Sequence, residues 1–129
     1  MEITELIGKT LTEVINNEDE LIFVCDNGDK YKLYHEQDCC ENVSIEDING
    51  DLKDLIGTPI LKAEESTSEK NPEGIELPEY QDCFTWTFYK LATINGYVDI
   101  RWYGESNGYY SEAVDFRKAD ENGNYSRWD

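Results

Sequence analysis

The residue types best suited to chemistry are concentrated in residues 35–41, whose sequence is His-Glu-Gln-Asp-Cys-Cys-Glu. This segment holds the only histidine of the chain and two of its four cysteines. Structural zinc sites usually have four ligands, which are drawn mainly from imidazole nitrogen and thiolate sulfur. His35, Cys39 and Cys40 supply three such ligands if the chain turns after a strand that ends near His35. We therefore predict a structural zinc ion that pins this segment to the rest of the sheet.

The fourth zinc ligand is less well defined by the sequence. Cys83 is the first candidate, and Asp38 or Glu64 are carboxylate alternatives, whereas Cys25 lies beside a predicted turn and is left out. The spacing lacks the paired Cys-x-x-Cys pattern of common zinc sites. Adjacent cysteines in a regular strand also point to opposite faces. The alternative interpretation is that one of the adjacent cysteines is a buried apolar thiol and that His35 is bonded to a carboxylate at a strand end.

The same residues give little support for catalysis. A serine or cysteine nucleophile needs a base beside it, and His35 is the only base of that kind. No Gly-x-Ser-x-Gly turn occurs, and the glycines mark turns instead of a phosphate-binding loop. The surrounding carboxylates disfavour a thiolate at Cys39 or Cys40. Adjacent acids such as Glu46 and Asp47 point to opposite faces of a strand, so we expect a protein that is not an enzyme.

Acidic residues dominate the composition and are concentrated in the middle of the chain. The 129 residues include 29 acids and 11 bases, for a net charge of −18. Residues 35–82 hold fourteen acids and three bases, a net charge of −11. Solubility is one explanation of such a charge. The other is an electronegative surface for a basic partner that itself binds nucleic acid.

The charge and the hydropathy exclude several other functions. Like charges repel, so the protein should not bind nucleic acid or anionic membranes unaided. No apolar run approaches the roughly 20 residues that a membrane-spanning helix needs. Residues 1–5, Met-Glu-Ile-Thr-Glu, lack the basic start of a signal peptide. We expect a soluble, cytoplasmic protein.

Alternating apolar residues and turn signals predict short strands joined in hairpins. Residues 10–15 predict one strand, and residues 21–25 and 31–35 predict a hairpin around Asn27-Gly28. With these two residues as the loop, Phe23 should lie opposite Lys32. Later strands are predicted at 43–48, from 59 to 65, at 84–93, at 97–102 and around Val114 and Phe116. Residues 4–7 and 51–56 predict short helical turns that end at Gly8 and Gly57.

These elements predict a single domain over residues 1–129, of the β-rich α+β class, with an antiparallel sheet of hairpins and one or two short helices. Residues 66–82 are rich in Ser, Glu, Asn, Pro and Gly and predict a mobile acidic loop. Residues 119–129 predict a C-terminal tail. The aromatic residues of the second hairpin should pack mainly into the core, with some tyrosines exposed for protein contact.

Six segments resemble a family of small phage and prophage proteins whose activity is uncharacterised. The resemblance covers nearly the whole chain, and the segments are 34–41 (YHEQDCCE), 45–52 (IEDINGDL), 55–60 (LIGTPI), 86–90 (WTFYK), 100–104 (IRWYG) and 106–111 (SNGYYS). Small acidic phage proteins include many inhibitors of host defence. The sequence is similar to a candidate anti-CRISPR protein directed against a type II RNA-guided nuclease in the cytoplasm of the host cell.

The resemblance implies a non-enzymatic inhibitor that binds a basic channel of the nuclease and blocks loading of guide or target DNA. From the charge alone, we expect six carboxylates to imitate part of the charge density of DNA. These residues are Glu46, Asp47, Asp51, Asp54, Glu64 and Glu65. The alternative is a metal-stabilised phage accessory domain that binds another protein, in which the acidity serves only solubility.

Overall fold

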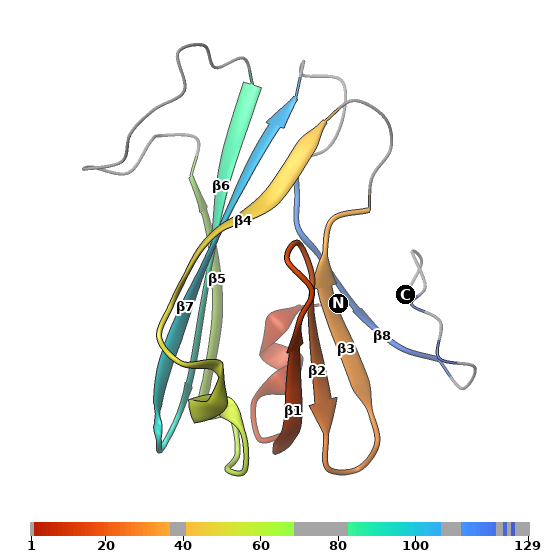
Figure 1. The fold of residues 1–129 in the computed structure, drawn as a ribbon, viewed down its shortest axis with the longest axis vertical. Helices are drawn as coiled ribbons and strands as arrows, with labels where there is room; N and C mark the ends of the chain where they lie inside the picture. The colour runs from red at the N-terminus through yellow and green to blue at the C-terminus, as the bar shows by residue number, and fades with distance from the viewer. Residues whose placement is uncertain are drawn as a thin grey trace.

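Two four-stranded antiparallel sheets pack face to face in this protein (Figure 1). The structure is a computed structural model that describes residues 2–36, 41–68, 83–106, 112–120, 123 and 125. The strands are β1 (Leu11–Asn16), β2 (Leu21–Cys25), β3 (Lys30–Tyr34), β4 (Asn42–Asn49), β5 (Lys62–Ser68), β6 (Cys83–Thr93), β7 (Gly96–Ser106) and β8 (Asp115–Lys118). Helical structure in these ranges is confined to two 3-10 turns, η1 (Ile3–Leu6) and η2 (Leu52–Leu55).

The first sheet has the strand order β1-β2-β3-β8. The predicted β2–β3 hairpin is confirmed, but its predicted register is wrong by one residue, because Phe23 lies opposite Tyr31 and not Lys32. The loop has three residues, closed by hydrogen bonds between Cys25 and Gly28 (3.0 Å) and between Cys25 and Asp29 (2.8 Å). Gly28 supplies the positive φ of 92° that such a loop needs. This register places Phe23 and Tyr31 together on the buried face.

The second sheet has the strand order β4-β7-β6-β5, so β4 and β5 are its two edges. Its centre is the long β6–β7 hairpin, in which Thr93 pairs with Gly96 across a two-residue turn. The edge strand β4 has an irregular register between Ile45 and Asp47, which is a β-bulge. The hairpin predicted at residues 84–93 and 97–102 is confirmed as β6 and β7. It is longer than predicted, since β6 begins at Cys83 and β7 ends at Ser106.

The hydrophobic core lies between the two sheets and takes alternate residues from each strand. On β7, Val98, Ile100 and Trp102 are buried, whereas Asp99 and Arg101 between them point to the other face. Both 3-10 turns add buried side chains to this core, and η1 packs against β5. The core side chains are Ile3, Leu6, Leu11, Leu21, Phe23, Cys25, Tyr31, Leu33, Val43, Leu55, Ile60, Ala63, Tyr89, Leu91, Val98, Ile100, Trp102 and Phe116.

The β-rich prediction is confirmed, with differences in detail. The strands form two sheets instead of one, and the buried side chains of both sheets meet in a single core. The predicted loop at 66–82 begins too early, since β5 continues through Ser68, and residues 69–82 lie outside the described ranges. Within the predicted tail, Ala119 pairs with Tyr125 in an isolated β-bridge. None of the described helices has the length and apolar character needed to span a membrane.

Candidate functional site

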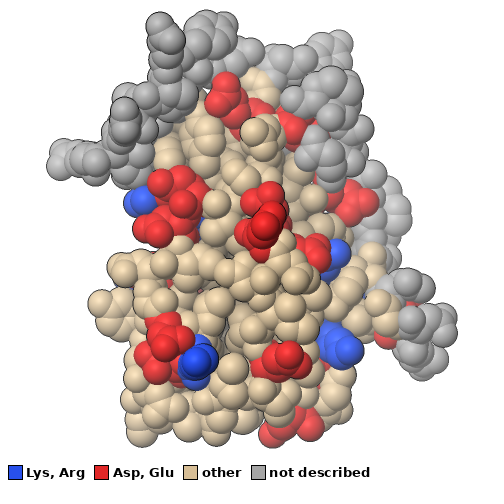
Figure 2. All heavy atoms as spheres, in the orientation of Figure 1, with Lys and Arg blue, Asp and Glu red and all other residues tan. Residues whose placement is uncertain are grey.

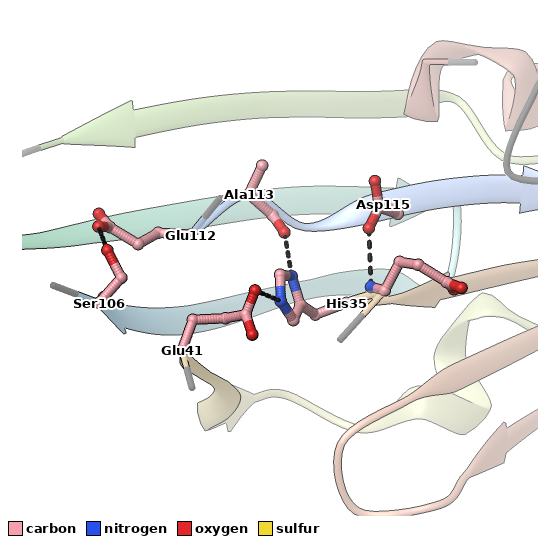
Figure 3. A network of polar contacts seen from close by, with 7 residues as sticks. His35, Glu41, Ser106, Glu112, Ala113 and Asp115 are labelled. Atoms are coloured by element: carbon pink, nitrogen blue, oxygen red, sulfur yellow. Dashed lines mark hydrogen bonds and ion pairs between the residues drawn. The ribbon is translucent and has the colours of Figure 1, made fainter. Parts of the chain in front are cut away.

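His35 follows β3, with a hydrogen bond at Nδ1 and a carboxylate near Nε2 that is within ion-pair distance but does not make a hydrogen bond (Figure 3). Its Nδ1 lies 2.7 Å from the carbonyl oxygen of Ala113, and because a carbonyl only accepts, Nδ1–H is the donor. Its Nε2 lies 3.4 Å from Oε2 of Glu41. The side chains are nearly inaccessible, at 4% exposure for His35 and 0% for Glu41. When Nδ1 carries the proton of a neutral ring, Nε2 has a lone pair and faces the Glu41 oxygen. The contact between Nε2 and Glu41 is attractive only when a second proton is held on one of these two atoms.

A second carboxylate, Glu112, lies close to this pair and is held by hydroxyl groups. Thr85 donates to its Oε1 at 2.8 Å, and Ser106 donates to its Oε2. Asp115, three residues on, accepts a hydrogen bond of 2.9 Å from the backbone N–H of Glu36. The end of the sandwich that holds β3, the start of β6 and the end of β7 is therefore polar inside, unlike its apolar centre.

The zinc prediction is only partly addressed by this geometry. Cys39, Cys40 and Asp38 lie outside the described residues. Cys83 pairs with Ser106 at the same end of the sandwich, and it is an exposed free thiol. The described ranges contain no group of three or more His, Cys, Asp or Glu placed to hold a metal ion. The structural zinc ion therefore stays a prediction, whereas the alternative contact between His35 and a carboxylate is present.

Two other residues considered for the zinc site are Glu64, an alternative fourth ligand, and Cys25, which was left out of the predicted set. Glu64, the other carboxylate alternative, lies on β5 and pairs with Lys62 at 3.6 Å. Cys25 is buried in the core at the end of β2. Burial is the main reason that the pKa of the Cys25 thiol is raised, so the thiolate is disfavoured there.

The six carboxylates predicted to contact a partner lie in three separate places. Glu46 and Asp47 are on β4, where both contact the guanidinium group of Arg101. Glu64 and Glu65 are on β5, at the other edge of the same sheet, three strand spacings or about 14 Å away. Glu64 and Glu65 are neighbours on a strand, so they point to opposite faces.

The third pair of predicted carboxylates lies at η2, where Asp51 makes a contact through its side chain and Asp54 makes one through its backbone. Asp51 caps η2 and accepts a hydrogen bond of 3.0 Å from the backbone of Lys53. The backbone carbonyl of Asp54 accepts a hydrogen bond from the Thr93 hydroxyl. Figure 2 shows the acidic groups of one face in separate clusters with uncharged surface between them. These observations place the acids around the molecule and not in one compact array.

The outer face of the β4-β7-β6-β5 sheet, which points away from the core, carries a second set of functional side chains. On β6 these are Trp86, Phe88 and Lys90, which alternate with the buried Thr87 and Tyr89. The register sets them in rows across the sheet. One row is Asn49, Asp99, Lys90 and Glu64; the next is Asp47, Arg101, Phe88 and Ser66; the third is Ser44, Tyr103, Trp86 and Ser68.

Trp86 anchors the aromatic part of this outer face. It is 3% exposed, yet it is not part of the core between the sheets. The Tyr103 ring lies 4.7 Å from it at a tilt of 54°, and the Arg101 guanidinium carbon lies 5.7 Å from its ring centroid. The Phe84 ring stacks on Tyr103, with ring centroids 6.3 Å apart. The outer face therefore has its own small aromatic cluster, with a cation over it.

A groove of about 430 Å³ lies beside this cluster and is bordered by all four strands of the sheet. Phe88, Lys90 and Arg101 contribute to it from the two central strands, and Asp47 and Glu64 from the two edges. The groove thus combines one aromatic ring with cations at its centre and carboxylates on both sides. Such a mixture can contact a polar protein surface, and it contains no nucleophile paired with a base.

The sequence alone did not reveal this groove. The aromatic residues of the second hairpin were expected mainly in the core, and only Tyr89 and Trp102 of the two long strands are found there. Phe84, Trp86, Phe88, Tyr97 and Tyr103 belong to the other face. The sequence feature that could have predicted the outer aromatic residues is the alternation within residues 84–90. Phe84, Trp86 and Phe88 share one face of a strand, whereas Tyr89 lies on the other.

Comparison of the chain with known proteins identifies one matching family model. A family model described as a domain of unknown function (DUF7448) matches residues 4–116, which include all eight strands except the last residues of β8. Neither the curated proteins nor the solved structures contain a match to the chain.

Proposed function

The chain belongs to the DUF7448 family, and we propose that it is a non-enzymatic protein-binding domain that uses the outer face of the β4-β7-β6-β5 sheet. The observation that supports this proposal is the groove on this face, where Phe88, Lys90 and Arg101 lie beside the buried aromatic ring of Trp86. Aromatic residues and arginine are enriched in protein interfaces, where they contribute much of the binding energy.

The position of the most exposed aromatic residue supports the same face. Tyr97 is 62% exposed and pairs with Ala92 on the outer face of the hairpin. Ile94, 78% exposed, lies at the tip of the same hairpin. A large exposed ring next to an exposed apolar tip is a feature of surfaces that contact other proteins.

The charge indicates the chemistry of the partner. Two copies of this chain carry −18 each and repel one another, so a second copy is a poor occupant of the outer face. A partner with lysine and arginine side chains is attracted instead and meets carboxylates on both edges of the groove, at Asp47 and Glu64. The proposed partner is therefore a basic protein.

The experiment compares capture by the wild-type chain with capture by outer-face variants. Immobilised protein is exposed to a bacterial lysate, and a basic protein should bind the wild type and be lost with Phe88→Ala and Tyr97→Ala. Ile7→Ala is the control, because Ile7 is 48% exposed at the end of η1 and lies away from this face. Equal capture by all the variants would contradict the proposal.

A narrower form of this function is inhibition of a type II RNA-guided nuclease. Its support is the resemblance to phage proteins and the net charge of −11 in residues 35–82. The purified chain should form a complex with such a nuclease in size-exclusion chromatography and reduce its binding of DNA. If neither effect is found with several type II nucleases, this narrower form fails while the outer-face proposal is still tested by the capture experiment.

A further inference from the structure

Among the described strands, β5 is the sheet edge with the fewest features that prevent pairing with another chain. The edge strands β1 and β4 each contain a register shift, between Leu11 and Glu13 and between Ile45 and Asp47. The remaining edge strand, β8, has only four residues. Bulges and short lengths protect sheet edges against further pairing. β5 has neither, because its seven residues pair with β6 in an unbroken register.

The hairpin next to β5 determines the direction of the backbone groups at this edge. Thr93 and Gly96 pair directly across the two-residue turn, so these two residues exchange backbone hydrogen bonds with each other. Backbone groups alternate in direction along an antiparallel strand. The N–H and C=O groups of Phe88 and Lys90, at odd spacings from Thr93, therefore point to β5.

The same alternation identifies the residues of β5 that face the open edge. Ser66 and Glu64 pair with the two residues of β6 that point to β5, so their backbone groups point back to β6. The backbone groups of Glu65 and Thr67 point outward, and they make no backbone hydrogen bond with another described residue. Both residues are exposed, whereas Ala63, which faces the same way, is 2% exposed. The accessible edge therefore runs from Glu64 to Thr67.

Hollows lie on both sides of this accessible edge. The groove of about 430 Å³ on the outer face includes Glu64, Glu65 and Ser66 in its walls. On the side toward β8, two hollows of about 440 and 320 Å³ share Glu65, and the smaller one includes Thr67. The side chains of an added strand alternate between the two sides, so they enter the groove and these hollows in turn. In strand addition, backbone hydrogen bonds provide affinity and alternate pockets select the side chains.

Glu64 and Glu65 determine the charge of the segment that fits this edge. They point to opposite sides of β5, and opposite charges that face each other across two strands are stabilising. The matching segment therefore has two adjacent basic residues. Among the described residues, Glu65 has no ion pair and Glu64 has one with Lys62, at 3.6 Å. Charged side chains protect an edge against like-charged strands, and a second copy of this chain is repelled by its own net charge of −18.

We propose that β5, from Glu64 to Thr67, binds an extended segment of a partner protein as an added antiparallel strand that contains two adjacent basic residues. The backbone of this segment exchanges hydrogen bonds with Glu65 and Thr67. The inference rests on the proposed function for the basic character of the partner, and it adds the conformation of the bound segment and its position on the sheet.

A peptide with blocked ends and the sequence Thr-Val-Thr-Arg-Lys-Val-Thr is the probe for this edge. In an antiparallel arrangement its arginine lies opposite Glu65 and its lysine opposite Glu64. The peptide is titrated into the full chain, and NMR measures saturation and the hydrogen exchange of single amides. Exchange at Glu65 and Thr67 should slow by about tenfold or more, because binding gives these amides a partner. The amides of Glu64 and Ser66, which are bonded to β6, should exchange slowly with and without the peptide.

Two pairs of variants test the strand geometry. Methylation of the backbone nitrogen of the peptide's arginine, which points to β5, should weaken binding by about tenfold or more, whereas the same change at its lysine should cost less than about threefold. On the chain, Thr67→Pro removes an outward N–H and leaves the pairing with β6 intact, so it should weaken binding by about tenfold or more. Thr67→Val keeps this N–H and should bind as the wild type does, and melting temperatures show that both variants fold.

Other occupants of the edge give different exchange patterns. Slow exchange at Glu65 and Thr67 in the dilute free chain would overturn the proposal, because residues of the chain itself would then cover the edge. Slowing that depends only on the concentration of the chain would identify a second copy and would also overturn it. So would a peptide that never saturates, or equal weakening by the two methylated peptides. Equal capture of basic proteins by the wild type and Phe88→Ala rejects the outer-face function, whereas the exchange rates test the edge by themselves.

Discussion

His35 and Glu41 form a buried polar contact that the rest of the fold must support. Both side chains are almost completely inaccessible, and Nδ1 of His35 is held by a carbonyl 78 residues away in the sequence, at Ala113. Removing one member of such a pair leaves the other buried without its partner, which costs far more than losing a surface pair. This contact therefore ties the segment after β3 to the segment before β8.

Glu41→Ala should destabilise the protein by about 3–5 kcal/mol, because His35 Nε2 then faces a buried space without its carboxylate. Glu41→Gln keeps an oxygen acceptor and should cost less. Glu46→Ala is the control, since it removes an exposed carboxylate that pairs with Arg101 and should cost about 0–1 kcal/mol. Urea unfolding measures all three free energies, and similar losses for Glu41→Ala and Glu46→Ala would contradict the expectation.

The predicted zinc ion has a direct test by metal removal. If His35 shares an ion with the cysteines at 39 and 40, the purified protein should hold about one equivalent of zinc, and a chelator should lower its melting temperature. Since Nδ1 of His35 donates to Ala113, a metal ion would have to bind at Nε2, on the side of the ring where Glu41 now lies. A metal-free protein whose melting temperature does not respond to the chelator would reject the site.

At the scale of elements, the turn after β4 shows how closely the chain segments approach. Gly50 has a φ of 113°, and a Cβ atom added there would lie 2.6 Å from the carbonyl oxygen of Tyr97 on β7. Gly28, in the β2–β3 turn, has a similar φ of 92° with nothing within 4 Å of the added atom. The two glycines thus share a backbone conformation and differ in their surroundings.

Gly50→Ala should therefore destabilise the protein more than Gly28→Ala. Both changes force a side chain into the left-handed region, at a cost of about 1–3 kcal/mol. Gly50→Ala adds a clash with backbone that has no rotamer to relieve it, which typically costs another 1–3 kcal/mol or so. Thermal and urea unfolding measure the stability of the two variants. Equal losses of unfolding free energy would contradict the expectation and show that the turn before η2 can move away from β7.

At the scale of the whole molecule, the net charge of −18 opposes the compact state. The described surface shows acids in separate clusters, with a few lysines and arginines near them (Figure 2). Local pairs such as Lys32 with Glu20 at 3.0 Å relieve only part of this repulsion. The fold is therefore held by its apolar core against a self-repulsion that salt can screen.

Adding salt should raise the melting temperature of the free protein. The Debye length falls from about 30 Å at 0.01 M to about 10 Å at 0.1 M, so repulsion across the molecule is screened over this range. Binding of a basic partner should weaken over the same range, because salt screens that attraction too. Calorimetric scans in sodium chloride and potassium chloride test the first effect, and a melting temperature that falls with either salt would contradict it.

The strand pattern could be predicted from the sequence because it depends on neighbours along the chain. Alternation placed β2, β3, β4 and the β6–β7 hairpin correctly, and Asn27-Gly28 marked the first turn. The loop length was not predictable in the same way. Burying Phe23 and Tyr31 on one face selects a three-residue loop, and this choice depends on the core that both rings enter.

The sequence by itself determined a β-rich chain of hairpins, its acidity and the family to which its residues 4–116 belong. Only the tertiary structure decided that the strands divide into two sheets and which aromatic rings point away from the core. It also brought His35 to Ala113 and set Glu65 beside Tyr89. The physical reason is that alternation is a local property, whereas the face that becomes buried depends on contacts between segments far apart in the chain.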